Sequence, residues 1–273
     1  MNKSFFILFL FLISYSVSSQ KKETSIAWKK IDKGLFSVDY KSPQKAILGN
    51  QIITIIKINP KYYNFNLLSA KEKGEHTRTA KDWAITKKQI AVINAGMYQA
   101  DHATNLGYMK DYNFSNNNRL NKDNTIIAFN RKDSIVPEIQ IIDRTCQNWE
   151  ELKNKYNSFS QSIRMVDCNQ KNRWGQQNKK WSMVVIAIDK KENALFVSVR
   201  SPYSVHDFIN TLLKAPLNIK NIMYLEGGPE ASLYLNHNGK TIEKMGSYET
   251  GFNENDNNNI FWRIPNVIGI TKK

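Results

Sequence analysis

Short apolar runs rich in β-branched residues recur along most of the chain, and each is about as long as a typical β-strand. Polar segments containing Gly, Asn, Asp or Pro, which are turn-forming residues, separate them. The pattern therefore predicts a strand-rich fold. The expected strands lie at residues 52–58, 65–68, 90–93, 126–129, 139–142, 183–188, 194–199, 222–225, 232–235 and 267–270.

Helical spacing is rarer, and it is clearest in SVHDFINTLLKAP at residues 204–216. Apolar residues recur there at intervals of three and four, Ser204 and Asp207 have a capping-box spacing, and Pro216 predicts the end. TAKDWAITKKQ at 79–89 and NWEELKNKY at 148–156 are two further candidates. We therefore expect an α/β chain of the mixed α+β kind: a single compact domain whose central mixed, strand-rich sheet is flanked by a few helices.

Two Asn-rich segments have no periodic apolar face. They are NFSNNNRLNKDN at 113–124 and GFNENDNNN at 251–259. Such composition predicts surface loops.

The first residues carry a different pattern. Lys3 precedes an apolar run at residues 5–13, and small residues follow before Gln20, which is typical of a signal peptide. The run is shorter than the roughly 20 residues that a membrane-spanning helix needs. We expect a signal peptide at 1–19, an N-terminal lead-in at 20–51 and the functional domain at 52–273, with export to the periplasm or the medium and no stable membrane insertion afterwards.

Charge changes the picture only slightly. The formal net charge is +15, which suits a polyanionic partner, although scattered lysines in an Asn- and Ile-rich chain also arise from compositional bias. No basic run is interleaved with stacking aromatic residues, so we expect no nucleic-acid partner.

Cys146 and Cys168 are the only cysteines. An oxidising compartment would permit a bridge between them, but the sequence alone leaves the pairing open. Because the two cysteines do not have CxxC spacing, a structural zinc site is not expected.

Chemistry-bearing residues gather where expected strands end. In AVINAGMYQADHATNLGYM, a buried strand delivers Asn94 and Gly96, and a loop carries Asp101 and Asn105. The stretch IMYLEGGPEASLYL carries Glu226, Gly227, Gly228 and Glu230 between two apolar runs, QSIRMVDC carries Arg164, and VRSPYSVHD carries Arg200 and His206. Each has an ordinary structural explanation as a turn, an ion pair or a surface residue.

Taken together, these segments resemble a known family. VINAGMY, QSIRM, KKWSMVVIAID, MYLEGGPEASLYL and IPNVIGI occur in the order found in the phosphodiester glycosidase family, over roughly residues 52–270. The resemblance implies a compact α/β domain with its site at strand ends. It also implies hydrolysis of the bond between a sugar's anomeric carbon and a phosphodiester, and bacterial relatives are often associated with envelope glycans or exopolysaccharide.

The residue types suit that chemistry. Glycosyl transfer to water needs a carboxylate, so Glu226 is the first candidate for the base or nucleophile, and Glu230 is either a second catalytic acid or a cap for the following segment. Arg164 and Arg200 are candidates to bind the phosphate, because a guanidinium group matches its oxygens. Substrate contacts are further expected from the remaining polar and glycine positions, which are Asn94, Gly96, Asn105, His206, Gly227 and Gly228.

The chain also departs from the family pattern. Glu226 stands where the family usually has Asp, Ile163-Arg164 replaces a usual Gly-Pro, and Trp181-Ser182 replaces a frequent Arg-Thr. The segments RSPYSVHD and GSYETGF resemble those of a bacterial branch, so the substrate can differ accordingly.

Two alternatives stay open at this point. One is a non-catalytic glycan-binding or exopolysaccharide-maturation protein on the same fold. The other is a metal-dependent phosphodiesterase in which Asp101, His102, Asn105 and Glu226 gather round a divalent ion. No cofactor is certain, and the sequence specifies neither the sugar nor the stereochemistry.

Overall fold

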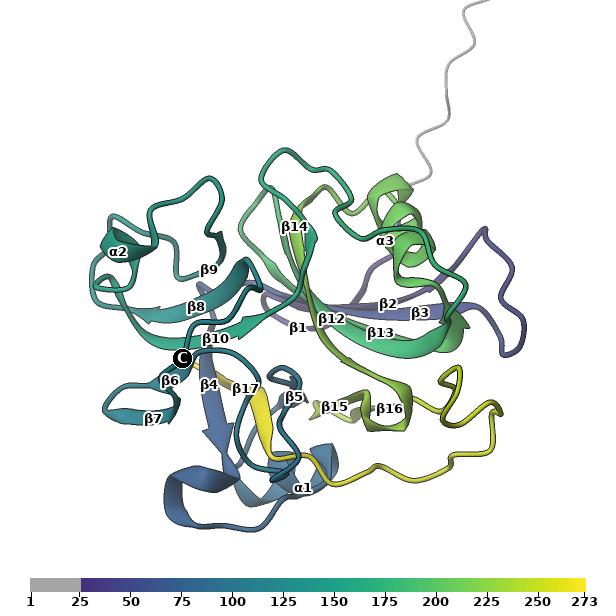
Figure 1. Ribbon diagram of the computed structural model, residues 1–273, viewed down its shortest axis with the longest axis horizontal. Coiled ribbons are helices and arrows are strands. Elements are labelled where there is room, and N and C mark those ends of the chain that lie inside the picture. Colours follow the sequence, from purple (N-terminus) through teal and green to yellow (C-terminus); the bar gives the residue numbers. More distant parts are fainter. Residues whose placement is uncertain (1–25) are drawn as a thin grey trace, which may run out of the picture.

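The structure is a computed structural model and describes residues 26–273. The signal peptide expected at 1–19 lies outside this range. The described residues form three sheets, in which all strand pairs are antiparallel, and a few short helices (Figure 1). The strand-rich α+β class is confirmed, but the single central mixed sheet is not what the structure shows. Few helices are available as crossovers, and antiparallel neighbours need only short connections.

The largest sheet has seven strands. It runs in the order β1 (Lys29–Asp32), β2 (Leu35–Lys41), β3 (Ile52–Ile58), β13 (Ala194–Tyr203), β12 (Trp181–Asp189), β14 (Ile219–Gly227) and β11 (Arg164–Val166). The segment expected as a lead-in at 20–51 therefore supplies two strands to this sheet. The division of the chain at residue 52 stays a prediction.

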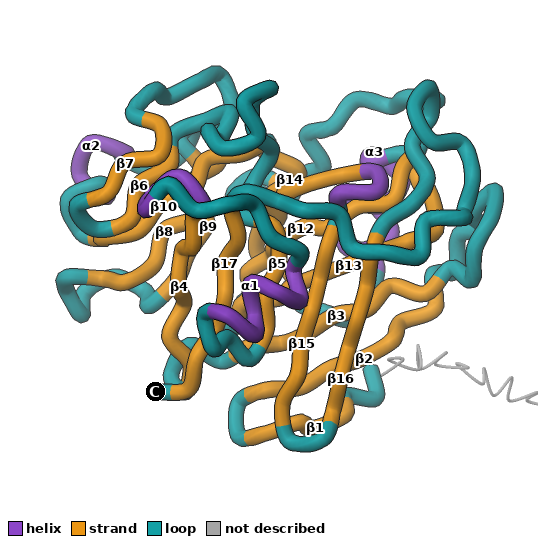
Figure 2. Tube along the Cα trace, turned by 90° about the horizontal axis from the view of Figure 1, so that it is seen from below, coloured by secondary structure: helices purple, strands orange, loops and turns teal. Residues whose placement is uncertain are grey.

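Two five-stranded sheets pack beside it (Figure 2). One runs in the order β7 (Phe114–Asn117), β6 (Met109–Asp111), β10 (Tyr156–Ser162), β8 (Thr125–Arg131) and β9 (Ile139–Asp143). The other runs in the order β16 (Lys240–Met245), β15 (Ser232–His237), β5 (Ala91–Asn94), β17 (Asn266–Lys272) and β4 (Tyr63–Ser69).

The helices are α1 (Ala80–Thr86), α2 (Trp149–Leu152) and α3 (Val205–Lys214), with 3₁₀ turns η1 (Ala70–Lys73) and η2 (Gly228–Glu230). The cap expected for α3 is present, since the Ser204 side chain accepts a hydrogen bond from the Asp207 backbone N–H. None of the helices in the described range is long and apolar enough to cross a bilayer.

The core lies where the three sheets meet. Its main cluster joins side chains of the seven-stranded sheet, such as Phe196, to Phe129 of one smaller sheet and Ile93 of the other. Alternate residues of β12 face opposite ways: Val184 belongs to this cluster, and Val185 packs under α3. A strand buried on both faces reads as a continuous apolar run, which explains why the sequence predicts it well.

Every apolar run expected to be a strand overlaps one, with boundaries that differ by a few residues; the run at 90–93, for example, begins one residue before β5. The strands that the pattern does not predict are polar or short, namely β1, β2, β6, β7, β10, β11 and β16. The Asn-rich segment at 113–124 is not wholly loop, because β7 occupies its start and pairs with β6. The second Asn-rich segment, at 251–259, has no helix or strand, as expected.

Candidate functional site

The site begins at the end of β14, where the strand delivers Glu226. The pairing of β14 with β12 matches Glu226 to Val184 and Tyr224 to Val185, so Leu225 has no partner and the strand bulges. Bulges re-aim the side chains beside them. Glu226 is only 7% exposed, yet its side chain lines a cavity.

The two glycines after Glu226 meet different demands. A Cβ on Gly227 would lie 2.2 Å from the hydroxyl of Tyr224 and 2.7 Å from the indole of Trp181, so two aromatic rings approach this backbone closely. Gly228 has a φ of 61°, and a Cβ there would lie 2.4 Å from a carboxylate oxygen of Glu249. The Gly-Gly pair thus makes the turn and leaves room for the cavity wall.

The cavity has a volume of about 240 Å³. Aromatic and apolar side chains form its walls, and carboxylates from separate segments reach into it. Its lining residues are Met97, Ile163, Trp174, Trp181, Tyr224, Glu226, Gly227, Glu230 and Glu249. Of these described residues, none is Lys, Arg or His. Aromatic faces beside hydrogen-bonding carboxylates suit a polyhydroxylated ring better than a multiply charged anion.

Burial and neighbouring charge act strongly on Glu226. Removal from water, the nearby Glu230 and the more weakly acting Glu249 together raise the pKa of its carboxyl to about 8. The Gly227 backbone N–H, which donates to Oε1 at 3.0 Å, opposes the rise. Burial and Glu230 also raise the pKa of Glu249, while Lys179 opposes that shift. At neutral pH, Glu226 therefore carries a proton.

Glu230 has a different environment. It lies in η2, and the hydroxyl of Tyr98 donates a hydrogen bond to its Oε1 at 2.7 Å. Burial and this bond raise the pKa of Tyr98, which keeps the phenol protonated as a donor. Glu226 and Glu230 thus differ: Glu226 is protonated, and the Glu230 side chain is held by a hydrogen bond from Tyr98.

The side chains of Asn94 and Asn105 are buried and bond the main chain. Asn94 donates to the Glu230 carbonyl at 3.1 Å and accepts from the Ser232 N–H at 2.8 Å, so it fixes both sides of the η2 turn. Asn105 donates to the carbonyls of Gly107 and Gln161. Neither lines the cavity.

Gly96 packs against Asn105, since a Cβ there would lie 2.9 Å from the Asn105 Oδ1. Its φ of 136° also favours glycine. Glycine at position 96 therefore lets the two ends of the 95–107 loop pack closely against each other.

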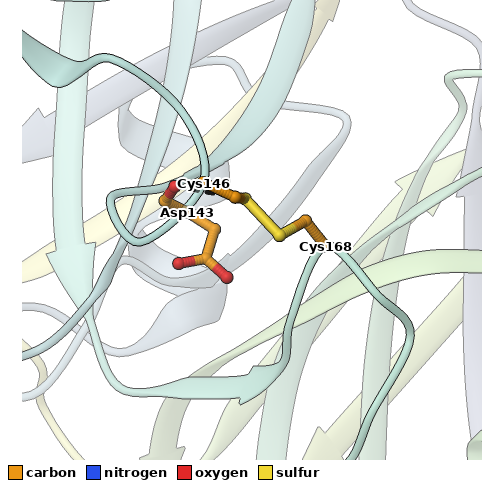
Figure 3. A group of neighbouring side chains, drawn as sticks. All are labelled: Asp143, Cys146 and Cys168. Carbon is orange, nitrogen blue, oxygen red and sulfur yellow. Dashed lines mark hydrogen bonds between the residues drawn. A yellow bond between two sulfur atoms is a disulfide. The ribbon is translucent and has the colours of Figure 1, made fainter.

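Arg164 lies outside the cavity lining and pairs with Asp143 at 2.9 Å. Asp143 also lies beside Cys146 and Cys168, which form a disulfide (Figure 3). This is the one cluster of potential metal-ligating side chains in the described part of the chain, but both sulfur atoms are consumed by the bridge. The cluster holds two sheets together, because Asp143 ends β9 and Arg164 begins β11.

Arg200 also lies elsewhere. It pairs with Asp256 and donates to the carbonyls of Met245, Asp256 and Asn258, and it lines a separate cavity. His206, on the first turn of α3, has Nδ1 at 2.8 Å from the Trp174 carbonyl and so supports one wall of the Glu226 cavity from outside. The structure does not bring the two expected phosphate-binding arginines to Glu226.

Asp101 caps its own loop. Its carboxylate accepts from the backbone N–H groups of Ala103 and Thr104 and from the Thr104 hydroxyl, and these bonds lower its pKa to about 2. Neither Asp101 nor His102 lines the cavity. The set expected for a divalent ion is therefore not gathered round Glu226.

Several residues that line the cavity or bond its carboxyl groups were not singled out from the sequence. Tyr98 directly follows the Asn-Ala-Gly-Met motif, and Trp181 and Glu249 lie in segments noted only for their resemblance to the family. Trp174 follows no motif, and only the fold brings it to the cavity, where its ring lies 5.6 Å from that of Tyr224.

Known structures share this fold. The catalytic domain of zebrafish N-acetylglucosamine-1-phosphodiester alpha-N-acetylglucosaminidase, auto-inhibited by its pro-peptide, matches with a TM-score of 0.63 and 13% identity, over 88% of this chain and 84% of that chain. A hypothetical protein from Synechocystis matches with a TM-score of 0.61 and 12% identity, over 91% of this chain and 64% of that one. At such identities the likeness shows the fold alone.

Comparison with curated protein sequences finds no match. The phosphodiester glycosidase family, in contrast, matches residues 87–271, which is more than half of the chain and includes the β5 motif, the η2 turn and β17. The family expected from the ordered motifs is thus confirmed: this chain belongs to the phosphodiester glycosidase family.

Proposed function

We propose that the chain is an exported hydrolase that cleaves the bond between a sugar's anomeric carbon and a phosphodiester in an envelope or extracellular glycan. Family membership and the shared fold support the reaction class. One observation carries the proposal: Glu226 and Glu230 line the same aromatic-walled cavity but lie in different environments. Pairs of carboxyl groups with divided roles are typical of glycosidases.

The environments assign the roles. Glu226, protonated at neutral pH, donates its proton to the phosphate oxygen as the bond from that oxygen to the anomeric carbon breaks. Glu230, held by Tyr98, either takes a proton from the attacking water or attacks the anomeric carbon itself. The products are the free sugar and a phosphomonoester.

This division revises the role expected for Glu226 from the sequence, where it was the candidate base or nucleophile. It also suits a cavity whose described lining has no basic side chain. A proton from Glu226 compensates the charge that develops on the leaving phosphate, which is the task otherwise given to a bound cation.

Two observations support export as part of the proposal. The first residues have the charged, apolar and small-residue pattern of a signal peptide. The Cys146–Cys168 disulfide is the kind of bond that persists in oxidising compartments.

The test is incubation of the mature chain with UDP-N-acetylglucosamine and a panel of sugar-1-phosphodiesters, with and without chelator, while released free sugar is measured. We expect release that falls as the pH rises through about 8, because Glu226 then loses its proton. Glu226→Gln should lower kcat by about 1,000-fold or more without unfolding the chain. Glu254→Gln, an exposed carboxylate outside the cavity, is the matched control. Full activity in Glu226→Gln would refute the assignment of the acid.

A second candidate is a glycan-binding protein without turnover. The aromatic walls and the lack of basic side chains among the described lining residues favour it. Calorimetry separates the two candidates: phosphorylated glycans that bind in the cavity and stay intact would support the binding protein.

A further inference from the structure

The segment that joins β16 to β17, here called the strap and defined as residues 246–264, contains no helix or strand. It runs along the edge of the molecule, in yellow-green at the lower right of Figure 1. The composition of its Asn-rich half is typical of an ordinary surface loop. Its hydrogen bonds and ion pair, however, hold the segment in one position.

The strap carries Glu249 into the cavity. Glu249 forms an isolated β-bridge with Trp181, and its backbone N–H donates to the Asn253 carbonyl at 2.9 Å, which closes a tight turn. The carboxylate then lies over Gly228, where a Cβ would be 2.4 Å from Oε2. Glu249 therefore lines the cavity together with Glu226 and Glu230 although it comes from a distant part of the chain.

Two residues of the seven-stranded sheet hold the strap. The buried hydroxyl of Ser182 accepts from the backbone N–H groups of Ser247 and Tyr248, the residues just before Glu249. Arg200 pairs with Asp256 and donates to strap carbonyls on the far side of the turn. Ser182 also donates to the Arg200 carbonyl, so the two anchors are linked.

The Glu249 carboxylate lines the cavity and receives no hydrogen bond from any residue in the described range. Carboxylate oxygens that face a cavity without donors are suited to accept hydrogen bonds from a ligand. Hydroxyl groups on a sugar ring are donors of that kind, and the rings of Trp174 and Trp181 provide apolar faces beside them.

We propose that Glu249 is a substrate-binding residue that accepts hydrogen bonds from sugar hydroxyl groups, and that Arg200 is a positioning residue that fixes the strap carrying it. The inference rests on the proposed function for the identity of the ligand. It gives Arg200 a task in place of the phosphate contact expected from the sequence.

Variants at Glu249 test the first half. For the sugar-1-phosphodiester that the wild-type chain hydrolyses, Glu249→Ala should raise KM by about 10-fold to 100-fold and change kcat by much less. The reason is that the variant cannot form the hydrogen bond between the charged carboxylate and the bound sugar. Glu249→Gln keeps an acceptor oxygen, so its KM should lie between those of the wild-type chain and Glu249→Ala. Glu254→Ala, a strap carboxylate outside the cavity, is the control and should match the wild-type chain.

Arg200→Lys tests the second half, because lysine keeps the charge but lacks the planar guanidinium group that reaches the Asp256 carboxylate and three carbonyls. Hydrogen exchange of the amides of residues 247–258 should become at least about 10-fold faster while the amides of β12 stay protected. KM should rise as in Glu249→Ala. Unchanged exchange and unchanged KM in Arg200→Lys would overturn the positioning role.

Binding of free monosaccharides, measured by calorimetry on the same variants, separates this inference from the proposed function. Weaker sugar binding in Glu249→Ala, in a chain that hydrolyses no diester, would retain Glu249 as a sugar ligand and reject the hydrolase. Hydrolysis with equal KM in the wild-type chain and Glu249→Ala would support the hydrolase and reject Glu249 as a sugar ligand. A wild-type chain that neither hydrolyses a diester nor binds a sugar would overturn both.

Discussion

At the scale of a single residue, the proposed acid Glu226 should also affect the stability of the fold. Its pKa of about 8 in the folded chain lies above the ordinary value of 4.5, so the folded protein keeps a proton that the unfolded chain releases between these pH values. The free energy of unfolding should therefore fall as the pH rises from about 4.5 to about 8.

Glu226→Gln removes this titration. Between pH 4.5 and 8.5, the variant should lose less unfolding free energy than the wild-type chain, by on the order of 2–4 kcal/mol. Urea unfolding of both proteins at the two pH values measures the difference. Parallel pH profiles would show that Glu226 is not protonated in the folded state.

Tyr98 is the second residue whose role is local. Tyr98→Phe removes the hydroxyl that donates to Glu230 and leaves the ring in place, so kcat should fall by about 10-fold with little change in stability. Steady-state kinetics on the diester panel provide the measurement. Tyr112→Phe, at a tyrosine that is 53% exposed, is the control. A kcat equal to wild type would mean that Glu230 needs no orienting donor.

At the scale of elements, the η2 turn depends on β5 beside it. Asn94, at the end of β5, bonds both the Glu230 carbonyl and the Ser232 N–H. Asn94→Ala therefore leaves the buried Ser232 N–H without its partner, and the Glu230 carbonyl keeps only the Ser232 hydroxyl as a donor. We expect a loss of about 1–3 kcal/mol in unfolding free energy, together with reduced kcat because Glu230 is no longer fixed. Denaturant unfolding and kinetics test both effects. The control is Asn64→Ala, at an exposed position of β4, which should change neither the unfolding free energy nor kcat.

Elements buried on one or both faces were predictable from the sequence, and elements defined by their neighbours were not. β3 and β12 are continuous apolar runs because both faces pack in the core. β10 is mostly polar, and its Ser158, Ser160 and Gln161 side chains find hydrogen-bond partners in neighbouring strands and loops, which allows their burial. No local pattern records such partners.

The same distinction applies to the site. The Glu-Gly-Gly turn could be placed at a strand end because glycine and carboxylate stand next to each other in the chain. The partners of Arg164 and Arg200 are 21 and 56 residues away, so the sequence could not show that both guanidinium groups are engaged in ion pairs. Glu249 reaches the cavity only through strap contacts with the seven-stranded sheet.

At the scale of the whole molecule, one junction joins two sheets. The disulfide, the ion pair of Arg164 with Asp143 and a hydrogen bond from Asn221 to the Ile141 carbonyl all connect β9 and its following turn to β11 and β14. The bridged cysteines are 22 residues apart in sequence. A disulfide that closes a loop of that length stabilises a fold by about 3 kcal/mol, chiefly by restricting the unfolded chain.

In the variant with both Cys146→Ser and Cys168→Ser, the free energy of unfolding should therefore be about 3 kcal/mol lower than in the oxidised wild-type chain. Urea unfolding with and without reductant measures this, and reduced wild type should behave like the double variant. Equal stability of the oxidised chain and the variant would show that the ion pair and packing alone secure the junction.

The strap also bears on how such proteins diverge. It connects two strands without joining any sheet, so its length and sequence can change while every strand register in the molecule is kept. The proposed acid Glu226 lies at the end of β14 and its partner Glu230 in the η2 turn that follows, whereas Glu249 lies in the strap. Preference among sugars can therefore evolve, or be engineered by transplanting one segment, without rebuilding the reaction centre.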